Sequence, residues 1–403
     1  SCGLAYPLSA TLSLIGAEGV FLLYSRSQTE GQRLLTCIPA MLLCYWCFGY
    51  GAWLCLALML AAGIIAHHQK LSALLAVGIL LLPATQYPAT TWWSKPDLDR
   101  EYVLSLDVEH YFGNIQKMRK HLETDRQILW VTYYRNLYNA THPSEINSPV
   151  SLSRNLLAWN QPGTNGLILP VNPSASFLSI LFANELWFTL GDMTMAEHCA
   201  MLSMIFSPRN SGSRMIKRLA EINLVNGDDE AALKYLRILD KTLLHKSWAE
   251  KRIPGQQTPQ VKEWLEKKRR DIPTQDQLRS GNDAVTSLQN LVASNAGNLR
   301  AYEYLLCYHL LSKDLRSFVE DYVPGKVSSP IFAEALLIHL ARQGNIRAEE
   351  LIKYQIPVEI AKEFADYTRL YEAKDTSLKE KYGKTYWFYY HFATTEPGKE
   401  SKP

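Results

Sequence analysis

The near absence of charged side chains from the first 90 residues constrains this chain more than any other feature. Its 403 residues include 42 Lys and Arg and 39 Asp and Glu, a formal net charge of +3. Only five of these charged residues precede residue 91, namely Glu18, Arg26, Glu30, Arg33 and Lys70. Residues 34–66 carry none, although about 20 apolar residues already let a helix cross a bilayer. We therefore expect a transmembrane helical domain at residues 1–90 and a water-soluble domain at residues 91–403.

The apolar stretches predict about four membrane-spanning helices. Residues 4–24 and 71–87 are each long enough for one span, and residues 34–66 fit two short spans joined by a Gly-Tyr-Gly turn at residues 49–51. The tryptophan pair at residues 92–93 suits the membrane interface. The alternative is a soluble protein with very apolar core helices.

The basic residues of the apolar part predict its orientation, because Lys and Arg in short loops stay on the cytoplasmic side. Arg26 and Arg33 flank the first loop and Lys70 lies in the third, so four spans put all three on one face. Residues 91–403 then lie outside the cytoplasmic (inner) membrane, in the periplasm if the source is Gram-negative. Membrane lipid is accordingly an expected partner.

A turn motif recurs in the soluble part. The Gly-Asp pair at residues 191–192 is followed by Ala196, five positions after the glycine, and a proline, Pro208, ends this unit. The Gly-Asp pair at residues 227–228 is followed in the same way by Ala232. An alanine at this position lets two antiparallel helices approach closely, so we expect both alanines to be buried.

This pattern resembles that of tetratricopeptide repeats, which stack pairs of antiparallel helices. Weaker copies occur at residues 113–114, 313–314 and 344–345, the last with Ala348. The resemblance implies an all-α fold, with a degenerate tetratricopeptide-like α-solenoid following the transmembrane helices. A multi-span anchor leading into such a domain resembles uncharacterised membrane proteins of Bacteroidota. It also resembles the C-terminal parts of some polytopic glycan-transfer enzymes.

Residues 143–173 interrupt the helical rhythm with Pro, Asn, Ser and Gly, although connections between helices usually have about 2–8 residues. Long ordered loops often carry function. We therefore expect a partner-binding site on this segment and on the helix that follows it. The candidate residues are Trp159, Asn160, Gln161, Asn165 and Trp187. The alternative is a loop that only seals the junction between the first helices and the central repeats.

Two further segments have two interpretations each. The aromatic residues 386–392 suit a closing element that covers the last repeat, and a ligand-stacking platform is the alternative. The basic run at residues 267–270 suits a solvated helix face, and a contact with acidic lipid is the alternative.

Few residues suggest chemistry. Cys44 and Cys47 lie one helical turn apart, as in a membrane thiol oxidoreductase, but no cation near them would lower a thiol pKa. They are otherwise small apolar residues of a span. Glu18 lies inside the first span, where it serves either as a helix-packing contact or as a proton or ion site. We expect no other catalytic residue, no cofactor and no metal.

Composition and motifs together favour an interaction protein. The charge balance is not that of a nucleic-acid binder. The leading hypothesis is a membrane-anchored scaffold or docking module that binds a protein or peptide at the outer face of the cytoplasmic membrane. One alternative is the C-terminal part, or an accessory subunit, of a polytopic enzyme acting on glycans or lipid-linked substrates. We consider it because the sequence starts at Ser1 without Met, as a fragment of a longer protein would. The second is the thiol oxidoreductase.

Overall fold

The computed structural model describes residues 26, 98–123, 128–142, 152–158, 161, 163–171, 177–206, 212–274 and 284–393. The chain divides into two units, Ser1–Val108 and Glu109–Pro403. The expected spans lie outside the described residues, as do Glu18, Cys44 and Cys47. None of the described helices is both long enough and apolar enough to cross a membrane.

Every regular element in the described ranges is a helix, which confirms the predicted all-α class. The first elements are α5 (Leu98–Tyr111), α6 (Ile115–Leu122), α7 (Leu129–Thr141), α8 (Leu152–Asn155) and the 3-10 turn η2 (Gly163–Gly166). The central ones are α9 (Phe177–Leu190), α10 (Met193–Phe206), α11 (Ser213–Asn226), α12 (Asp229–Asp240), α13 (Lys246–Glu250) and α14 (Pro259–Arg269). The last are α15 (Ala284–Ser294), α16 (Leu299–Leu311), α17 (Leu315–Asp321), α18 (Pro330–Arg342), α19 (Ala348–Lys353), α20 (Val358–Glu372), α21 (Leu378–Tyr382) and α22 (Tyr386–Phe392).

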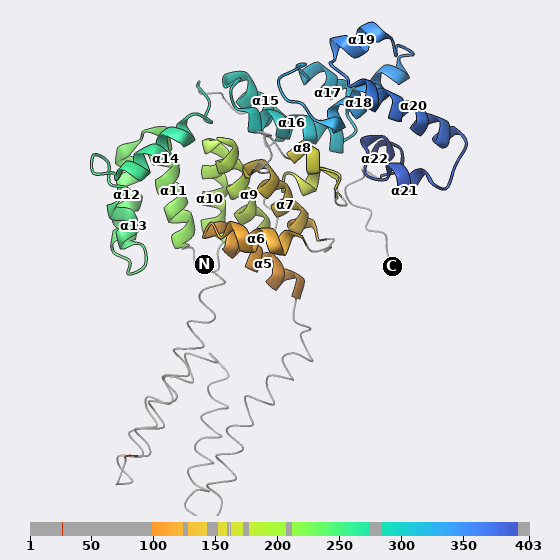
Figure 1. Ribbon diagram of the computed structural model, residues 1–403. Coiled ribbons are helices and arrows are strands. Elements are labelled where there is room, and N and C mark those ends of the chain that lie inside the picture. The colour runs from red at the N-terminus through yellow and green to blue at the C-terminus, as the bar shows by residue number, and fades with distance from the viewer. Residues whose placement is uncertain are drawn as a thin grey trace, which may run out of the picture. The chain divides into compact units, whose positions relative to one another are not determined.

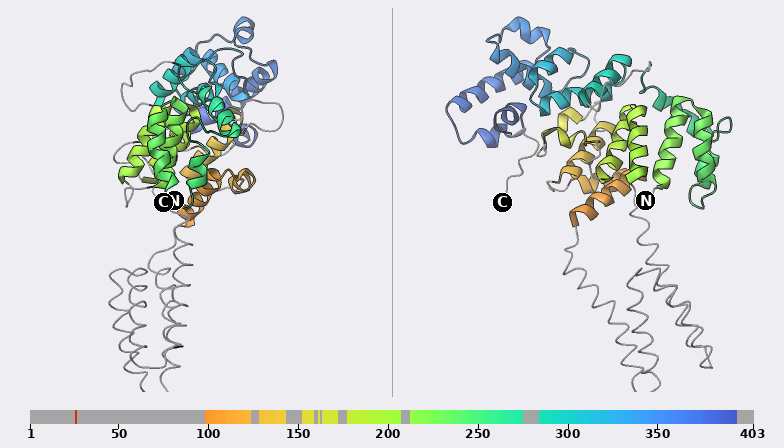
Figure 2. Two further views of the ribbon diagram at one scale, coloured as in Figure 1. Left: turned by 90° about the vertical axis from the view of Figure 1, so that its left-hand side faces the viewer. Right: turned by 180° about the vertical axis from the view of Figure 1, so that it is seen from behind.

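Successive helices of the second unit pack against each other. Helices α9 to α12 form a row in which each helix contacts the next, and α15 to α18 form another. Neighbours within the central row run in opposite directions, as Figures 1 and 2 show. Helix α9, the first of its row, is apolar on all sides, and nearly all of its residues are buried.

One backbone turn ends seven of the described helices. In each, an N–H donates to the carbonyl oxygen five residues earlier, at 2.9–3.0 Å, and the residue before that N–H has a positive φ. The five pairs recognised from sequence, beginning at residues 113, 191, 227, 313 and 344, all form this turn. Gln355 and Lys374 occupy the same position in two further turns. The same turn therefore ends helices in the first, central and last parts of the described chain.

In three of these turns, an aspartate directly after the positive-φ residue contacts both the helix that ends and the helix that begins. The Oδ1 atom of Asp192 accepts the N–H of Met195 at 2.9 Å, and Asp228 accepts that of Ala231 at 2.9 Å. Asp314 accepts the N–H of Ser317 at 3.0 Å. An aspartate in this place ends one helix through its backbone and caps the next through its side chain.

The predicted burial of the two alanines is confirmed. Ala196 and Ala232 are each 0% exposed. The copy at residues 344–345 differs, because its alanine, Ala348, is exposed and α19 has no buried residue. Pro208, the expected end of the repeat that contains Ala196, lies outside the described residues.

The described parts of residues 143–173 brace two groups of helices. Helix α8 contacts α7, α16 and α18, and η2 contacts α7 and α16. The amide of Asn136 on α7 donates to the carbonyl of Gly166 at 2.8 Å. Ser153 donates its N–H at 2.8 Å, and its hydroxyl at 2.6 Å, to Oε1 of Glu303 on α16. This arrangement agrees with the alternative in which the segment seals a junction.

The start of α16 completes that junction. The Asn298 amide donates to the carbonyl of Leu190 at 2.7 Å and to that of Asp271 at 2.8 Å. The Arg300 guanidinium donates to the carbonyls of Thr189 at 3.1 Å and Ala140 at 3.2 Å. These two polar side chains therefore satisfy carbonyl groups at the ends of α7 and α9, which helix geometry leaves without partners.

Helix α22 covers the end of the last group, as expected of a closing element. Tyr386 and Trp387 are buried. The hydroxyl of Tyr386 donates to the carbonyl of Leu310 at 2.9 Å, and that of Tyr389 to the carbonyl of Leu311 at 2.9 Å. These aromatic residues serve the core and cap α16.

Candidate functional site

The structure describes three of the five candidate partner-binding residues. Trp187 on α9 is only 1% exposed, so its ring belongs to the core and cannot contact a partner from the surface. The amide of Gln161 is half-buried, donates to the carbonyl of Leu156 and contacts Asn136. Asn165 is half-buried in η2. Trp159 and Asn160 lie outside the described residues. Of these residues, Gln161 links the segment to α7 through Asn136, and the three do not form one exposed surface.

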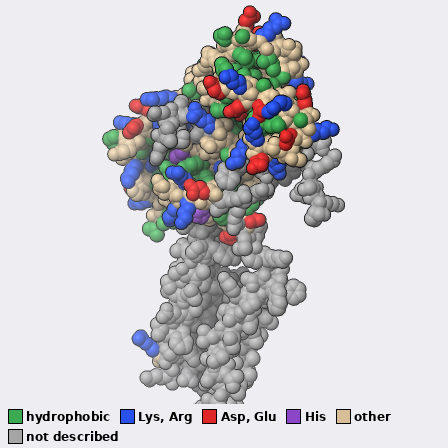
Figure 3. All heavy atoms as spheres, turned by 45° about the vertical axis from the view of Figure 1, so that its right-hand side comes forward, with side chains coloured by type: hydrophobic (Ala, Val, Ile, Leu, Met, Phe, Trp, Pro, Cys, Tyr) green, Lys and Arg blue, Asp and Glu red, His purple; other side chains and the backbone are tan. Residues whose placement is uncertain are grey.

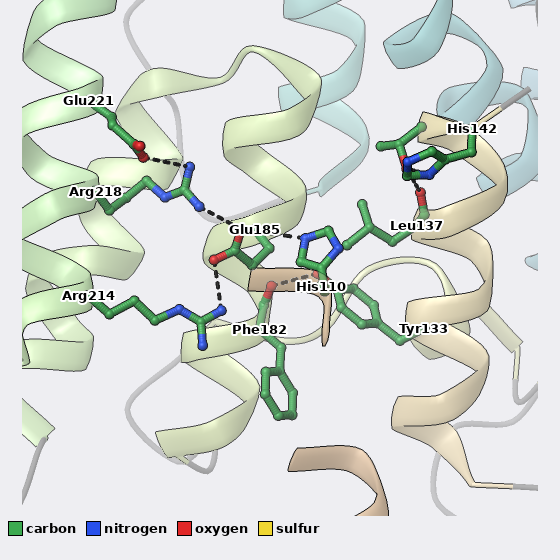
Figure 4. Close-up of polar contacts among 10 residues, drawn as sticks. His110, Tyr133, Leu137, His142, Phe182, Glu185, Arg214, Arg218 and Glu221 are labelled. Carbon is green, nitrogen blue, oxygen red and sulfur yellow. Dashed lines mark hydrogen bonds and ion pairs between the residues drawn. The ribbon is translucent and has the colours of Figure 1, made fainter. Parts of the chain in front are cut away.

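The most concentrated group of buried charges surrounds Glu185 on α9 (Figure 4). Its two carboxylate oxygens accept hydrogen bonds from Arg214 at 2.8 Å and from Arg218 at 2.6 Å, both on α11. Nε2 of His110, in the last turn of α5, lies 3.6 Å from the same carboxylate. Arg218 also pairs with Glu221 at 3.3 Å.

The charges of this group compensate one another. Burial favours the neutral form of Glu185, but the attraction of Arg218 and Arg214 is stronger and holds its pKa well below the usual range. Two arginines face two glutamates, so the group has no excess charge to offer a ligand. Its physical effect is to join α9 to α11.

The end of α5 attaches to the same helices. Nζ of Lys217 lies 4.6 Å from the centre of the Tyr111 ring and donates to its hydroxyl at 3.3 Å. The Arg214 guanidinium lies 4.8 Å from that ring centre. Together with His110, these contacts fix the last turn of α5 on the central row of helices.

The remaining buried titratable groups also serve the fold. Burial raises the pKa of Glu303, although its bonds from Ser153 oppose this, and its second oxygen has no hydrogen-bond partner. Burial raises the pKa of the Cys199 thiol to about 12 and that of Cys307 well above its usual value. Such thiols stay protonated and unreactive at neutral pH. The described residues contain no group of His, Cys, Asp and Glu that could hold a metal ion.

The basic run at residues 267–270 is only partly a solvated face. Arg269 donates to the carbonyls of Leu224 at 2.8 Å and Val225 at 3.0 Å, so it caps the end of α11. Nζ of Lys268 lies 4.6 Å from the centre of the Phe188 ring, and burial, with Arg218 and Arg300 nearby, lowers the pKa of Lys268 to about 8. These contacts have no signal in the sequence, because the partners of Lys268 and Arg269 lie on helices distant along the chain.

A candidate docking surface lies around α19, the helix that follows the row α15 to α18. This short helix stands between two tight turns and contributes nothing to the core. Ile346, Ile352 and Val358 are 45%, 77% and 60% exposed. Figure 3 shows hydrophobic side chains at the surface of the upper part of the view, where α19 lies, between Lys, Arg, Asp and Glu side chains. This surface was not predicted, because the Gly-Asn pair at residues 344–345 and Ala348 match the motif of a packed repeat.

Comparison with known proteins gives a family. No curated protein and no solved structure matches the chain. The family described as "Family of unknown function (DUF6057)" matches residues 1–91 and residues 73–393, and these segments include both the apolar N-terminal part and the helical part. The chain belongs to this family, DUF6057.

Proposed function

We propose that this protein is a membrane-anchored docking module whose helical domain holds a protein or peptide partner. In this proposal residues 1–90 anchor the chain in a cytoplasmic membrane and residues 91–403 lie on its outer face. The charge-poor N-terminal sequence and the distribution of Arg26, Arg33 and Lys70 support the anchor and its orientation. The repeated turns and the two buried alanines support a degenerate tetratricopeptide-like solenoid.

The observation that carries the proposal is the exposed surface of α19. A helix that buries none of its residues adds nothing to the core. Ile352 on α19, Ile346 before it and Val358 at the start of α20 nevertheless leave aliphatic side chains in water. Burying such a side chain contributes about 1.5–3 kcal/mol, which a partner can gain on binding. Exposed clusters of this kind mark interaction sites more often than scattered single residues do.

Site-specific photo-crosslinking tests the proposal in native membranes. A photoreactive amino acid replaces Ile352 in the full chain, and Val323, which is 51% exposed after α17, is the matched control position. We expect an adduct of one defined mass at position 352 and none of that mass at position 323. Adding Ile346→Lys and Val358→Lys should abolish the adduct, because a charge beside the partner's apolar surface must be desolvated.

The stability of each variant is checked by its thermal unfolding, which should not change at exposed positions. An adduct that forms equally at both positions, or that survives both lysine substitutions, would show that α19 is not a docking surface. Absence of any adduct at position 352 would lead to the same conclusion.

A further inference from the structure

Exposed apolar side chains collect at one end of the central row of helices. On α10 these are Met201, Ile205 and Phe206, all in its last two turns. Ile238 lies in the last turn of α12, and Leu243 and Leu244 follow in the turn that leads to α13. Helices α10 and α12 both run opposite to α11, so these residues lie at the same end of the row (Figure 1). The described residues of the opposite end, around the turns at 191–192 and 227–228, expose no large hydrophobic side chain.

The turn between α12 and α13 has a defined structure. The N–H of Thr242 donates to the carbonyl of Leu239 at 2.9 Å, and its hydroxyl donates to the same carbonyl at 2.7 Å. The N–H of His245 donates to the Thr242 hydroxyl at 3.2 Å. Leu239 and Ala249, on either side of the turn, are part of one buried cluster. This turn nevertheless holds Leu243 and Leu244 98% and 81% exposed.

The charges around the two leucines are mainly positive. Residues 241–252 contain three lysines and one arginine against a single glutamate, and Asp240 precedes them. Lys241 and Lys246, on either side of the leucine pair, are exposed. Burial, helped by Lys217, lowers the pKa of His245, so this histidine is neutral at neutral pH and adds no charge. The turn therefore presents two exposed leucines, Leu243 and Leu244, between two exposed lysines, Lys241 and Lys246.

Magnitudes favour a lipid surface over a protein partner. The two leucines project from a turn, a shape that enters a fluid lipid layer but by itself gives little of the roughly 800 Å² that each side of a stable protein interface buries. A bilayer needs no matching shape. Each inserted leucine removes apolar surface from water, and each lysine near an anionic surface adds an electrostatic attraction. A domain already tethered to the membrane needs only such a weak contact, because the tether keeps its effective concentration high.

We propose that the turn between α12 and α13 inserts Leu243 and Leu244 into the interfacial layer of an anionic lipid bilayer, while Lys241 and Lys246 contact the headgroups. The exposed ends of α10 and α12 would lie next to the same surface. The contact would hold the helical domain in one orientation on the membrane. This inference rests on the membrane anchor in the proposed function.

Depth-dependent fluorescence quenching tests this contact in the full chain. The chain is reconstituted in nanodiscs of phosphatidylcholine and phosphatidylglycerol in equal parts, some with nitroxide-labelled acyl chains. A polarity-sensitive fluorescent amino acid replaces Leu244, and Ile352, which is 77% exposed on α19, is the control position. We expect a blue-shifted emission and several-fold stronger quenching at position 244 than at position 352. Lys241→Glu with Lys246→Glu should reduce the quenching at position 244.

Each outcome supports or contradicts the contact. Equal quenching at the two positions would overturn it and would leave the anchor and the α19 surface intact. Quenching that is indifferent to both charge reversals would overturn the role of the lysines. A chain that does not enter the nanodiscs at all would overturn both this contact and the membrane anchor, whereas crosslinking at position 352 reports on the docking surface independently.

Discussion

Glu185 pairs with two arginines that have almost no contact with water, and Glu221 supplies the second negative charge. Both guanidinium groups lost their hydration on folding, and the carboxylate that replaces it comes from another helix. A buried charge without its partner is costly, so the group is far more sensitive to loss of one member than a surface ion pair is. The strength of this group therefore depends on Glu185.

Glu185→Gln should destabilise the protein by about 3–5 kcal/mol, because Arg214 and Arg218 would share only a neutral amide. The control is Glu320→Gln, which breaks the exposed pair with Arg316 and should cost less than about 1 kcal/mol. Denaturant-induced unfolding of both variants measures the difference. A similar small loss in both would mean that the Glu185 group does not stabilise the fold.

The two buried alanines give a second residue-scale prediction. Ala196→Leu and Ala232→Leu should each lower the free energy of unfolding by about 1–3 kcal/mol, since the added side chain would push the paired helices apart. Ala348→Leu is the matched control, because Ala348 is exposed on α19 and should change stability by less than about 0.5 kcal/mol. If all three variants were equally stable, close helix approach would not depend on these alanines.

Among the elements, the turns were the most predictable part of the fold. Glycine or aspartate identified five of them from sequence, since glycine accepts a positive φ and aspartate caps the following helix. The turn at Lys374 carries the aspartate signal, because Asp375 follows it as Asp314 follows Lys313, but it was not recognised. Gln355 adopts the same backbone without either signal, so its turn was not predicted. Packing explains the exception, because side chains with no turn preference adopt this backbone when the flanking helices require it.

The turn glycines should differ in their tolerance of a side chain. Gly227→Ala should cost about 1–2 kcal/mol, because a positive φ strains any L-residue and no atom lies within 4 Å of the added Cβ. Gly191→Ala should cost about 1–3 kcal/mol more, since its Cβ would lie 2.3 Å from the carbonyl oxygen of Asp271. Thermal unfolding measures both variants, and equal losses would argue against the close approach of α9 to residue 271.

The contact between α18 and α22 should depend on pH through Glu334. Burial raises the pKa of this carboxyl to about 7. The N–H of Tyr386 donates to the carboxyl and opposes this increase, but its effect is smaller. Between about pH 4.5 and pH 7 the folded protein binds a proton that the unfolded chain does not, so stability falls as pH rises through this window.

Glu334→Gln should remove this part of the pH dependence. Its amide oxygen can still accept the N–H of Tyr386, and the residue no longer ionises. The melting temperatures of the wild type and the variant are compared below and above the window. The variant should gain stability relative to the wild type on the alkaline side, and parallel pH profiles would show that Glu334 is not the group responsible.

For the whole molecule, sequence alone predicted the all-α class and the two central helix pairs, which depend on local signals. A loop that seals the junction was one of two alternatives for residues 143–173, but its contacts could not be predicted, because Ser153 and its partner Glu303 are separated by 150 residues. The same holds for Glu185, whose partners lie on α5 and α11. Trp187 was expected on a binding surface but lies in the core, since α9 is surrounded by other helices and has no polar face.

Placement of residues 91–403 outside the cytoplasmic membrane is the proposal on which the class of partner depends. Alkaline phosphatase, which is active only outside the cytoplasm, and green fluorescent protein, which fluoresces when it folds in the cytoplasm, can each be fused after residue 399. The charge distribution around Arg26, Arg33 and Lys70 predicts an active phosphatase fusion and a dark fluorescent one in the membrane fraction. An inactive phosphatase fusion with a bright fluorescent one would contradict the outward placement of the helical domain.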